Sequence, residues 1–271
     1  MNNNDNKSKS KYLKENLAGI KHKLIVLSGK GGVGKSTVAV NVANTLADKG
    51  FKVGILDVDI HGPSIAKLLG IEGKVLISNK DGDLEAIKVN ENLYALTIAA
   101  LLRSPDDPVI WRGPLKMKMI KQFLGDIKWP QLDFLIIDCP PGTGDEPLSS
   151  VQIVGNLDGS IIVSTPQDLS LLDARKTINF SKKLNVEILG IVENMSGFKC
   201  PHCGEMINIF EGMGVKKAAE DFGVDILGQI PIDPNISKTG DMGESYMKNH
   251  SDAESAKEFS KIADAILAKF E

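Results

Sequence analysis

Runs of apolar, often β-branched residues alternate with helical patterns along most of the chain. The runs predict strands at 23–28, 52–57, 92–97, 134–138, 160–165, 188–193 and 226–230. The helical patterns predict helices at 35–49, 114–124, 169–184, 215–222 and 253–270. The strand runs are continuously apolar rather than alternating, which is typical of parallel strands covered on both faces. The pattern therefore predicts an α/β fold, with a doubly wound, mostly parallel sheet and helices on both faces.

The pattern also predicts how the chain is divided. Residues 1–20 are mostly polar, and we expect a disordered tail there. This stretch has no apolar core of the kind that a secretory signal needs, so we expect none. Residues 21–271 are expected to form a single domain. It would include a small hairpin at 75–89 that turns at Asp81-Gly82.

Composition and charge narrow the range of partners. Of the 271 residues, 42% are hydrophobic and 25% are charged, which is ordinary for a soluble globular protein. The net charge of −3 gives no basic footprint for nucleic acid, and no apolar run approaches the roughly 18 residues of a membrane span. The predicted helix 253–270 has an acidic polar face, so we expect it to pack on the domain rather than on a membrane. Three cysteines, an odd number, argue against a disulfide framework and favour the reducing cytoplasm.

Residues 29–37, Gly-Lys-Gly-Gly-Val-Gly-Lys-Ser-Thr, carry the clearest chemistry because they lie between a predicted strand and a predicted helix. This is the phosphate-binding loop pattern in the context that it requires. Glycines let backbone N–H groups surround an anion, and the following helix adds the positive end of its dipole. Lys35 would supply charge to the outer phosphates, and the Ser36 hydroxyl would hold Mg²⁺. Because no guanine-specific Asn-Lys-x-Asp segment is present, we expect the nucleotide to be ATP.

Two predicted strands end in carboxylates. The apolar run 134–138 ends at Asp138, as a Walker B strand does, and Asp138 would hold the magnesium ion through water. The run 52–57 ends at Asp57 and is followed by Asp59. If that strand continues, its period of two puts both side chains on the same side. A turn or capping role is an equally open interpretation for Asp57.

The segment Cys200-Pro201-His202-Cys203 has several interpretations from its residues alone. A thioredoxin-like redox pair normally opens a helix, and the adjoining Gly204-Glu205 gives that poor support. A zinc site or an iron–sulfur cluster suits soft thiolates but needs about four ligands. Cys139 is expected to be a small buried residue, and His202 a solvated loop residue.

One chain therefore offers two thiolates, Cys200 and Cys203, to a centre that needs about four. Two copies related by a two-fold axis would bring four thiolates together at the axis. The ligand count thus predicts a homodimer with a zinc ion or an iron–sulfur cluster at its interface.

The loop, with its early lysine at Lys30, resembles the deviant Walker A loop. That loop is shared by nitrogenase iron protein, MinD-type and ParA-type partition ATPases, arsenite pump ATPases and Mrp-type iron–sulfur carriers. The resemblance implies that Lys30 crosses a dimer interface to the partner's phosphates. It implies that Asp59 orients the attacking water and that Gly142 contacts the γ-phosphate. Asn194 and the turn 231–234 match positions that contact adenine in the group.

Five segments together resemble the Mrp/ApbC iron–sulfur cluster carrier ATPases over about residues 20–250, namely 57–64, 107–114, 138–145, 193–196 and 200–203. The resemblance implies an ATP-binding homodimer that holds a labile 4Fe-4S cluster between its subunits and passes it to apo-proteins, with weak ATP hydrolysis coupled to that handling. The implied catalytic residues are Lys30, Lys35 and Asp59, and the cluster ligands are Cys200 and Cys203 of both subunits. The implied nucleotide contacts are Gly29, Lys30, Gly31, Gly32, Val33, Gly34, Lys35, Ser36, Thr37, Asp138, Gly142, Asn194, Pro231 and Asp233.

Alternatives from other classes stay open at this point. A MinD/ParA-like positioning ATPase would bind DNA or a membrane, against which the charge pattern argues. An electron carrier like nitrogenase iron protein has its two ligand cysteines far apart in sequence, whereas here both lie in one segment. A zinc-stapled dimeric ATPase would share the same four thiolates. Trp111 and Arg112 lie in a matched segment, and we expect packing or an interface contact for them.

Overall fold

The computed structural model describes residues 16–59, 62–74, 76, 78, 84–97, 121, 125–210 and 212–271. The predicted helix 114–124 lies almost entirely outside these residues. Trp111, Arg112 and the predicted turn Asp81-Gly82 also lie outside them.

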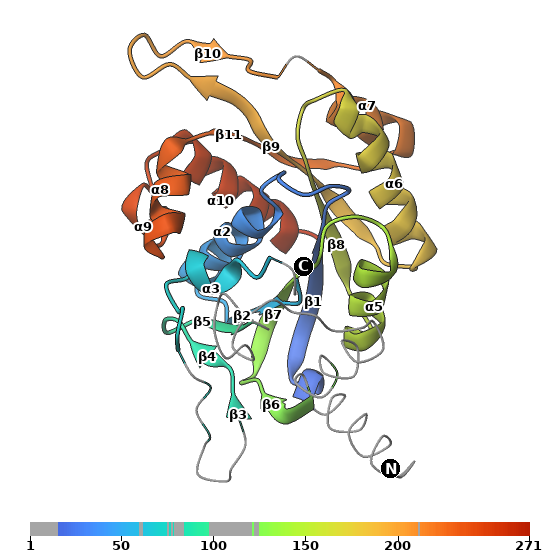
Figure 1. The fold of residues 1–271 in the computed structure, drawn as a ribbon, viewed down its shortest axis with the longest axis vertical. Helices are drawn as coiled ribbons and strands as arrows, with labels where there is room; N and C mark the ends of the chain where they lie inside the picture. The colour runs from blue at the N-terminus through green and yellow to red at the C-terminus, as the bar shows by residue number, and fades with distance from the viewer. Residues whose placement is uncertain are drawn as a thin grey trace.

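In the described residues, a nine-stranded sheet has the order β10-β9-β8-β1-β7-β2-β5-β4, with β11 paired to β9 (Figure 1). Its strands are β1 (Ile20–Leu27), β2 (Val53–Asp57), β4 (Ile87–Lys88), β5 (Leu93–Thr97), β7 (Leu132–Asp138), β8 (Gly159–Ser164), β9 (Ile188–Lys199), β10 (Met206–Ile207) and β11 (Ile226–Ile232). The pairs β4–β5 and β9–β10 are antiparallel, and the central pairs are parallel. The carboxyl ends of β1, β2, β7 and β8 therefore meet at one edge, where such sheets bind ligands.

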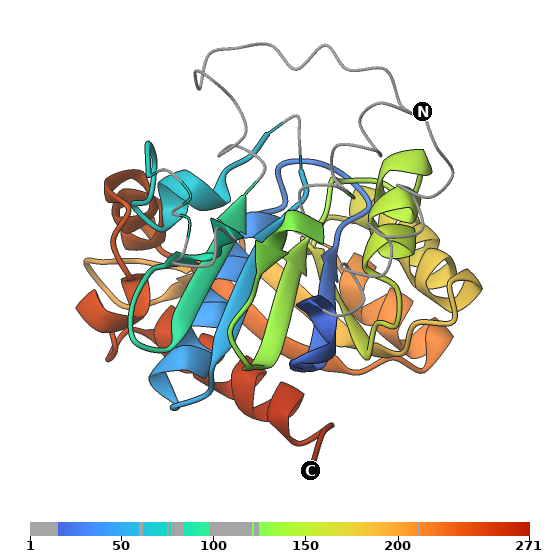
Figure 2. The ribbon, with the colours of Figure 1, turned by 90° about the horizontal axis from the view of Figure 1, so that it is seen from below.

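Helices cover both faces of this sheet (Figure 2). On one face lie α2 (Lys35–Asp48), α3 (Ile65–Leu68), α8 (Pro234–Met242), α9 (Tyr246–Asn249) and α10 (Glu254–Leu267). On the other face lie α5 (Asp145–Val154), α6 (Leu169–Lys183) and α7 (Gly214–Phe222). The predicted doubly wound α/β architecture is confirmed.

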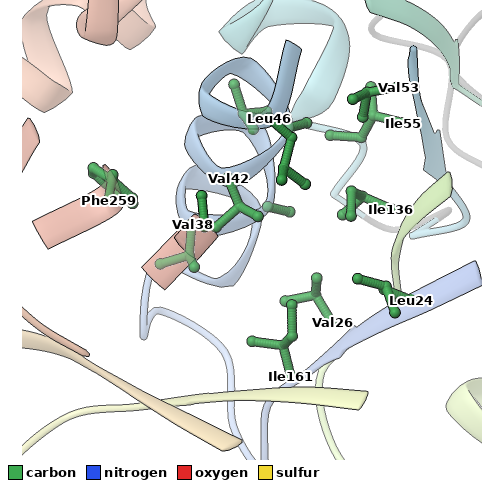
Figure 3. Close-up of a cluster of buried hydrophobic side chains, with 14 of the residues drawn as sticks. Leu24, Val26, Val38, Val42, Leu46, Val53, Ile55, Ile136, Ile161 and Phe259 are labelled. Atoms are coloured by element: carbon green, nitrogen blue, oxygen red, sulfur yellow. The ribbon is translucent and has the colours of Figure 1, made fainter. Parts of the chain in front are cut away.

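Both faces of β1 are buried over residues 24–27, which explains why that part of the strand is continuously apolar. Leu24 and Val26 pack into the core beneath α2 (Figure 3), whereas Ile25 and Leu27 belong to the core on the opposite face. Phe259 of α10 also lies in the first core and is 1% exposed. The interpretation of the last helix as a packing element is thereby confirmed. No helix in the described part of the chain is long and apolar enough to cross a membrane.

One domain boundary and one predicted hairpin differ from the predictions. Leu17 and Ile20 are buried, so the folded part begins before the predicted boundary at residue 21. In the segment 75–89, Ser78 forms an antiparallel bridge with Leu84, as a hairpin would. However, β3 (Leu84–Glu85) pairs in parallel with β6 (Ile127–Lys128), and β4 pairs with β5. Residues 84–88 therefore contribute one strand to each of the two sheets.

The strand β9 is longer than its apolar run. The prediction ended at residue 193, but the strand continues to Lys199 because its last residues pair with β10 and β11. The cysteine segment, predicted to lie in a loop, is thus the turn of a β9–β10 hairpin that extends from the body of the molecule (Figure 1).

Candidate functional site

The phosphate-binding loop connects the carboxyl end of β1 to the first turn of α2. Gly32 and Gly34 have φ of 79° and 81°, in the left-handed region that favours glycine. A β-carbon on Gly34 would also collide with the side-chain amide of Asn194. Gly34 is the N-cap of α2 and has no side chain to cap it, so the helix N-terminus is open to an anion.

Lys35 and Ser36 of this loop both contact Asp138 at the end of β7. Lys35 Nζ donates to Asp138 Oδ1 at 2.6 Å, and Ser36 Oγ donates to Asp138 Oδ2 at 2.5 Å. The Lys35 side chain is 6% exposed and that of Asp138 is 1% exposed. Burial raises the pKa of Asp138, and the charge of Lys35 opposes that rise. A hydroxyl and a carboxylate in contact are oxygen ligands that suit Mg²⁺ together with phosphate oxygens.

Asp57 lies beside Asp138, because β2 and β7 pair in register at these two residues. Its carboxylate accepts hydrogen bonds from the N–H of Asp59 at 3.0 Å and from the hydroxyl of Thr97 at 3.2 Å. Burial, followed by the negative charge of Asp138, raises the pKa of Asp57 to about 8. This shift favours the protonated, neutral form of Asp57 over the charged form.

Asp59, the predicted water-orienting residue, lies in the loop after β2. Because β2 ends at Asp57, the two carboxylates do not share one face of a continuous strand, contrary to that expectation. Asp59 is 8% exposed, and its Oδ1 accepts a hydrogen bond from the N–H of Gly62 at 3.3 Å. It lies two residues beyond Asp57, which pairs in register with Asp138, at the same edge of the sheet.

Two further predicted phosphate contacts are held by bonds within the chain. Gly142 has φ of 99°, and its N–H donates to the carbonyl of Ser28 at 2.8 Å. Lys30 Nζ donates to the side-chain oxygen of Gln167 at 3.1 Å. Gln167 follows β8, so Lys30 lies along the carboxyl edge of the sheet. Its predicted reach into a second subunit stays a prediction.

The predicted adenine contacts occupy two places. Asn194 Nδ2 donates to the carbonyl of Val33 in the phosphate-binding loop at 2.9 Å. Pro231 and Asp233 line a groove of about 500 Å³, together with Cys200. The Asp233 carboxylate already has structural partners, because it caps α8 through the N–H of Asn235 and accepts from the Tyr246 hydroxyl.

The cysteine pair forms the turn between β9 and β10. Cys200 N donates to the carbonyl of Glu205 at 2.8 Å, and Gly204 N donates to the carbonyl of Cys200 at 2.9 Å. Backbone N–H groups of Cys203 and His202 donate to the Cys200 sulfur and lower the pKa of that thiol. Such N–H groups stabilise the thiolate, which is the form that binds metal.

The third cysteine is unlike the pair. Cys139 is fully buried after β7, and burial raises the pKa of its thiol, as expected for a structural residue. Cys200 is partly exposed and Cys203 is exposed. Among the described residues, no group of three or more His, Cys, Asp or Glu side chains is placed to hold a metal ion. Within that part of one chain, the two cysteines are therefore not joined by further side chains of these types in an arrangement that could hold a metal ion.

Several contacts of the site were not predicted. Gln167 was missed as the partner of Lys30, although its position just after a strand at the binding edge was a usable signal. The in-register placement of Asp57 against Asp138 could not be read from the sequence, because it depends on which strands are neighbours.

The parallel sheet, the glycine loop and the contacts among Lys35, Ser36 and Asp138 define a P-loop nucleoside triphosphatase. The sequence matches the ParA-type NUBPL iron-transfer P-loop NTPases over residues 19–267, and the chain belongs to that family. The resemblance to the Mrp/ApbC iron–sulfur cluster carrier ATPases is thereby confirmed.

Known proteins with similar sequences and structures agree with this membership. The chain is 49% identical over 249 residues to the iron–sulfur cluster carrier protein of Saccharolobus solfataricus, covering 92% of this chain and 83% of the relative. It is 47% identical over 253 residues to the cytosolic Fe-S cluster assembly factor Nubp2 homolog of Aedes aegypti, covering 92% and 98%. The nucleotide-binding protein of Archaeoglobus fulgidus, solved in complex with ADP, superposes with a TM-score of 0.77 and 38% identity, covering 87% and 92%.

Proposed function

We propose that this chain is an ATP-dependent iron–sulfur cluster carrier of the cytoplasm. Two copies would hold a labile 4Fe-4S cluster between them and pass it to apo iron–sulfur proteins. The observation that carries the proposal is the pair of accessible thiols, Cys200 and Cys203, at the tip of a hairpin that extends from a P-loop fold. The names of the Saccharolobus solfataricus and Aedes aegypti relatives support the same cargo.

The nucleotide half of the proposal rests on the phosphate-binding loop, residues 29–37. ATP would bind over the N-terminus of α2, with Lys35 directed at the outer phosphates and with Ser36 and Asp138 holding Mg²⁺. Asp59 would orient the attacking water. The ADP complex of the Archaeoglobus fulgidus relative supports nucleotide binding at this fold.

The remaining proposed nucleotide contacts are made by Lys30, by Gly142 and by the residues around the base. Lys30 would exchange its bond to Gln167 for a phosphate of the partner subunit, and the backbone of Gly142 would contact the γ-phosphate. The base would lie near Asn194, Pro231 and Asp233, where Asn194 offers both a donor and an acceptor.

The homodimer of the proposal is based on the ligand count. A four-iron cluster needs about four protein ligands, whereas the described residues of one chain bring two accessible thiols together. A two-fold axis at the hairpin tips would complete the set with the second chain's pair.

Anaerobic reconstitution tests the cluster. Wild-type protein should bind four iron and four sulfide per dimer, and Cys200→Ala should bind neither while keeping its affinity for ATP. His202→Ala, which changes a neighbouring side chain of the same turn, is the matched control and should bind the cluster. Iron and sulfide at wild-type levels in Cys200→Ala would contradict the proposal, and zinc without sulfide in wild-type protein would favour a zinc-stapled dimer.

Two measurements test the ATPase half and the dimer. Lys30→Ala should bind ATP as the wild type does but lose most ATP hydrolysis, because its ammonium group would act only across the interface. Light scattering should give the mass of two chains for the cluster-loaded protein. A monomer that keeps a full cluster would contradict the shared-ligand arrangement.

A further inference from the structure

One strand connects the phosphate-binding loop to the cysteine pair. Asn194 of β9 donates to the carbonyl of Val33 at 2.9 Å, and its amide lies against Gly34. The same strand continues to Lys199, the residue before Cys200. At about 3.3 Å per residue, six residues of strand span roughly 20 Å between the two sites.

The pairing of β9 with β11 changes register just after Asn194. Ile230 of β11 pairs with Asn194 and Ile232 pairs with Phe198, so β9 contains two more residues than β11 between these pairs. Such an insertion is a β-bulge, which bends a strand and changes the direction of the residues beyond it. Within it, Met195 has φ of 59°, a left-handed conformation that is uncommon for residues other than Gly, Asn, Asp and His. Unfavourable backbone conformations of this kind concentrate at switch regions.

A groove separates part of the hairpin beyond the bulge from the body of the molecule. The groove of about 500 Å³ has Phe198, Cys200 and Pro201 on its hairpin side and the segment 231–235 on its body side. Across it, Lys199 and Glu254 form an ion pair of 3.3 Å between exposed side chains, a kind of contact that contributes little stability.

We propose that Met195 is a positioning residue for the cysteine pair. Nucleotide binding at the phosphate-binding loop shifts Asn194, which contacts that loop. The left-handed bulge at Met195 then passes this shift along β9 and changes the orientation of Cys200 and Cys203. This inference rests on the proposed function for its ATP site and deepens it by naming the route between nucleotide and thiols. The left-handed region that the Met195 backbone occupies is small, so few neighbouring conformations are open to it. A change at Asn194 therefore moves the hairpin instead of being absorbed by the bulge.

The test measures thiol reactivity in the iron-free, reduced full-length chain. The rate of alkylation at Cys200 and Cys203 is measured by mass spectrometry with and without a magnesium complex of a non-hydrolysable ATP analogue, with buried Cys139 as the unreactive reference. We expect the nucleotide to change the wild-type rate by about fivefold or more, the lower end of usual coupling between sites. Met195→Gly, whose backbone absorbs the displacement, should bind nucleotide normally but respond by less than about twofold.

Two further variants separate coupling from packing. Met195→Asn removes the same side chain but favours the left-handed region, so it should keep the wild-type response. Asn185→Gly changes a left-handed residue, φ 54°, in the turn after α6 and should also keep it. Unchanged wild-type rates on nucleotide binding, or a wild-type response in Met195→Gly, would overturn the inference.

The result of the alkylation assay does not depend on whether the chain can assemble an iron–sulfur cluster. No iron is present in the assay, so a chain that fails to assemble a cluster but shows this pattern of rates still supports the link. A chain that fails to bind the analogue by calorimetry contradicts the proposed ATP site, and the link with it. Light scattering on the same samples shows whether the nucleotide drives dimerisation. If dimerisation alone shields the thiols, the alkylation rates of Met195→Gly and the wild type will change equally. That result counts against the link.

Discussion

The phosphate-binding loop and the cysteine hairpin are built in opposite ways. Lys35 and Asp138 are buried and bonded to each other where the central strands end. Cys200 and Cys203 lie at the tip of a two-stranded ribbon, and the neighbouring Met206 and Ile207 are 44% and 47% exposed. The core of one chain therefore fixes the nucleotide-binding residues, whereas the cysteine turn depends little on that core.

The largest expected effect is that of Lys35→Ala on stability. Removing the ammonium group leaves the Asp138 carboxylate buried beside Asp57, so we expect a loss of about 3 kcal/mol in urea unfolding at neutral pH. The control is Lys21→Ala, which removes an exposed ion pair of the same 2.6 Å length with Asp133 and should cost less than about 1 kcal/mol. If Lys35→Ala and Lys21→Ala lowered the free energy of unfolding equally, the buried ion pair would contribute no more to stability than the exposed one.

Gly34→Ala should have the next largest effect. The left-handed backbone and the Asn194 amide both exclude a β-carbon, so we expect a loss of about 2 kcal/mol and of nucleotide affinity. Gly31→Ala is the matched control in the same loop, because its β-carbon would meet its nearest neighbour at 4.0 Å. It should change stability by less than about 0.5 kcal/mol. Calorimetry and urea unfolding of both variants give the comparison.

The raised pKa of Asp57 makes stability depend on pH. The usual value is 3.8 and the folded value is about 8, so the folded state binds the extra proton between them. Stability from this group is therefore present below about pH 4 and falls as pH rises to about 8. Asp57→Asn cannot ionise and should lose less stability than the wild type between pH 6 and pH 8, by on the order of 1 kcal/mol.

Asp133→Asn is the control for that pH dependence. Burial raises the pKa of Asp133, but hydrogen bonds from Lys21 and Lys52 outweigh it and lower the pKa overall. The contribution of Asp133 is therefore lost only in acid, and this variant should match the wild-type slope between pH 6 and pH 8. An Asp57→Asn slope equal to that of the wild type would contradict the protonated state of Asp57.

The smallest effect is expected at the hairpin. Replacing both Cys200 and Cys203 by Ser should change the free energy of unfolding by less than about 0.5 kcal/mol, because both side chains are at the surface. Cys139→Ser puts a hydroxyl in the fully buried position and should cost about 1–3 kcal/mol. If the double variant cost as much as Cys139→Ser, the hairpin would belong to the cooperative core.

Sequence patterns predicted the features that depend on neighbours along the chain. The strand–loop–helix unit around residues 29–37 was predicted because its glycines and flanking apolar runs are local signals. Two contacts between distant segments were not predicted, since Lys30 lies 137 residues from Gln167 and Val33 lies 161 residues from Asn194. Their meeting is decided by the strand order.

Helix α8 and the end of strand β9 were not predicted, for other reasons. The helix α8 carries a clear local signal, Asp233 as N-cap and Pro234 in its first turn, but Asp233 was interpreted only as a base contact. The end of β9 has no apolar run, because residues beyond 194 are partly exposed and are held as a strand by backbone pairing with β10 and β11. Backbone pairing of this kind leaves little trace in the side-chain pattern.

The length of β9 has a consequence for how this architecture can diversify. With 12 residues it outgrows its neighbour β8, which has 6, and it carries the cysteine turn beyond the edge of the sheet. A β9–β10 hairpin of this kind can be shortened, lengthened or replaced without repacking the sheet and helices of the core. The nucleotide-binding core and the cysteine turn are thus structurally distinct parts of one polypeptide, joined by β9.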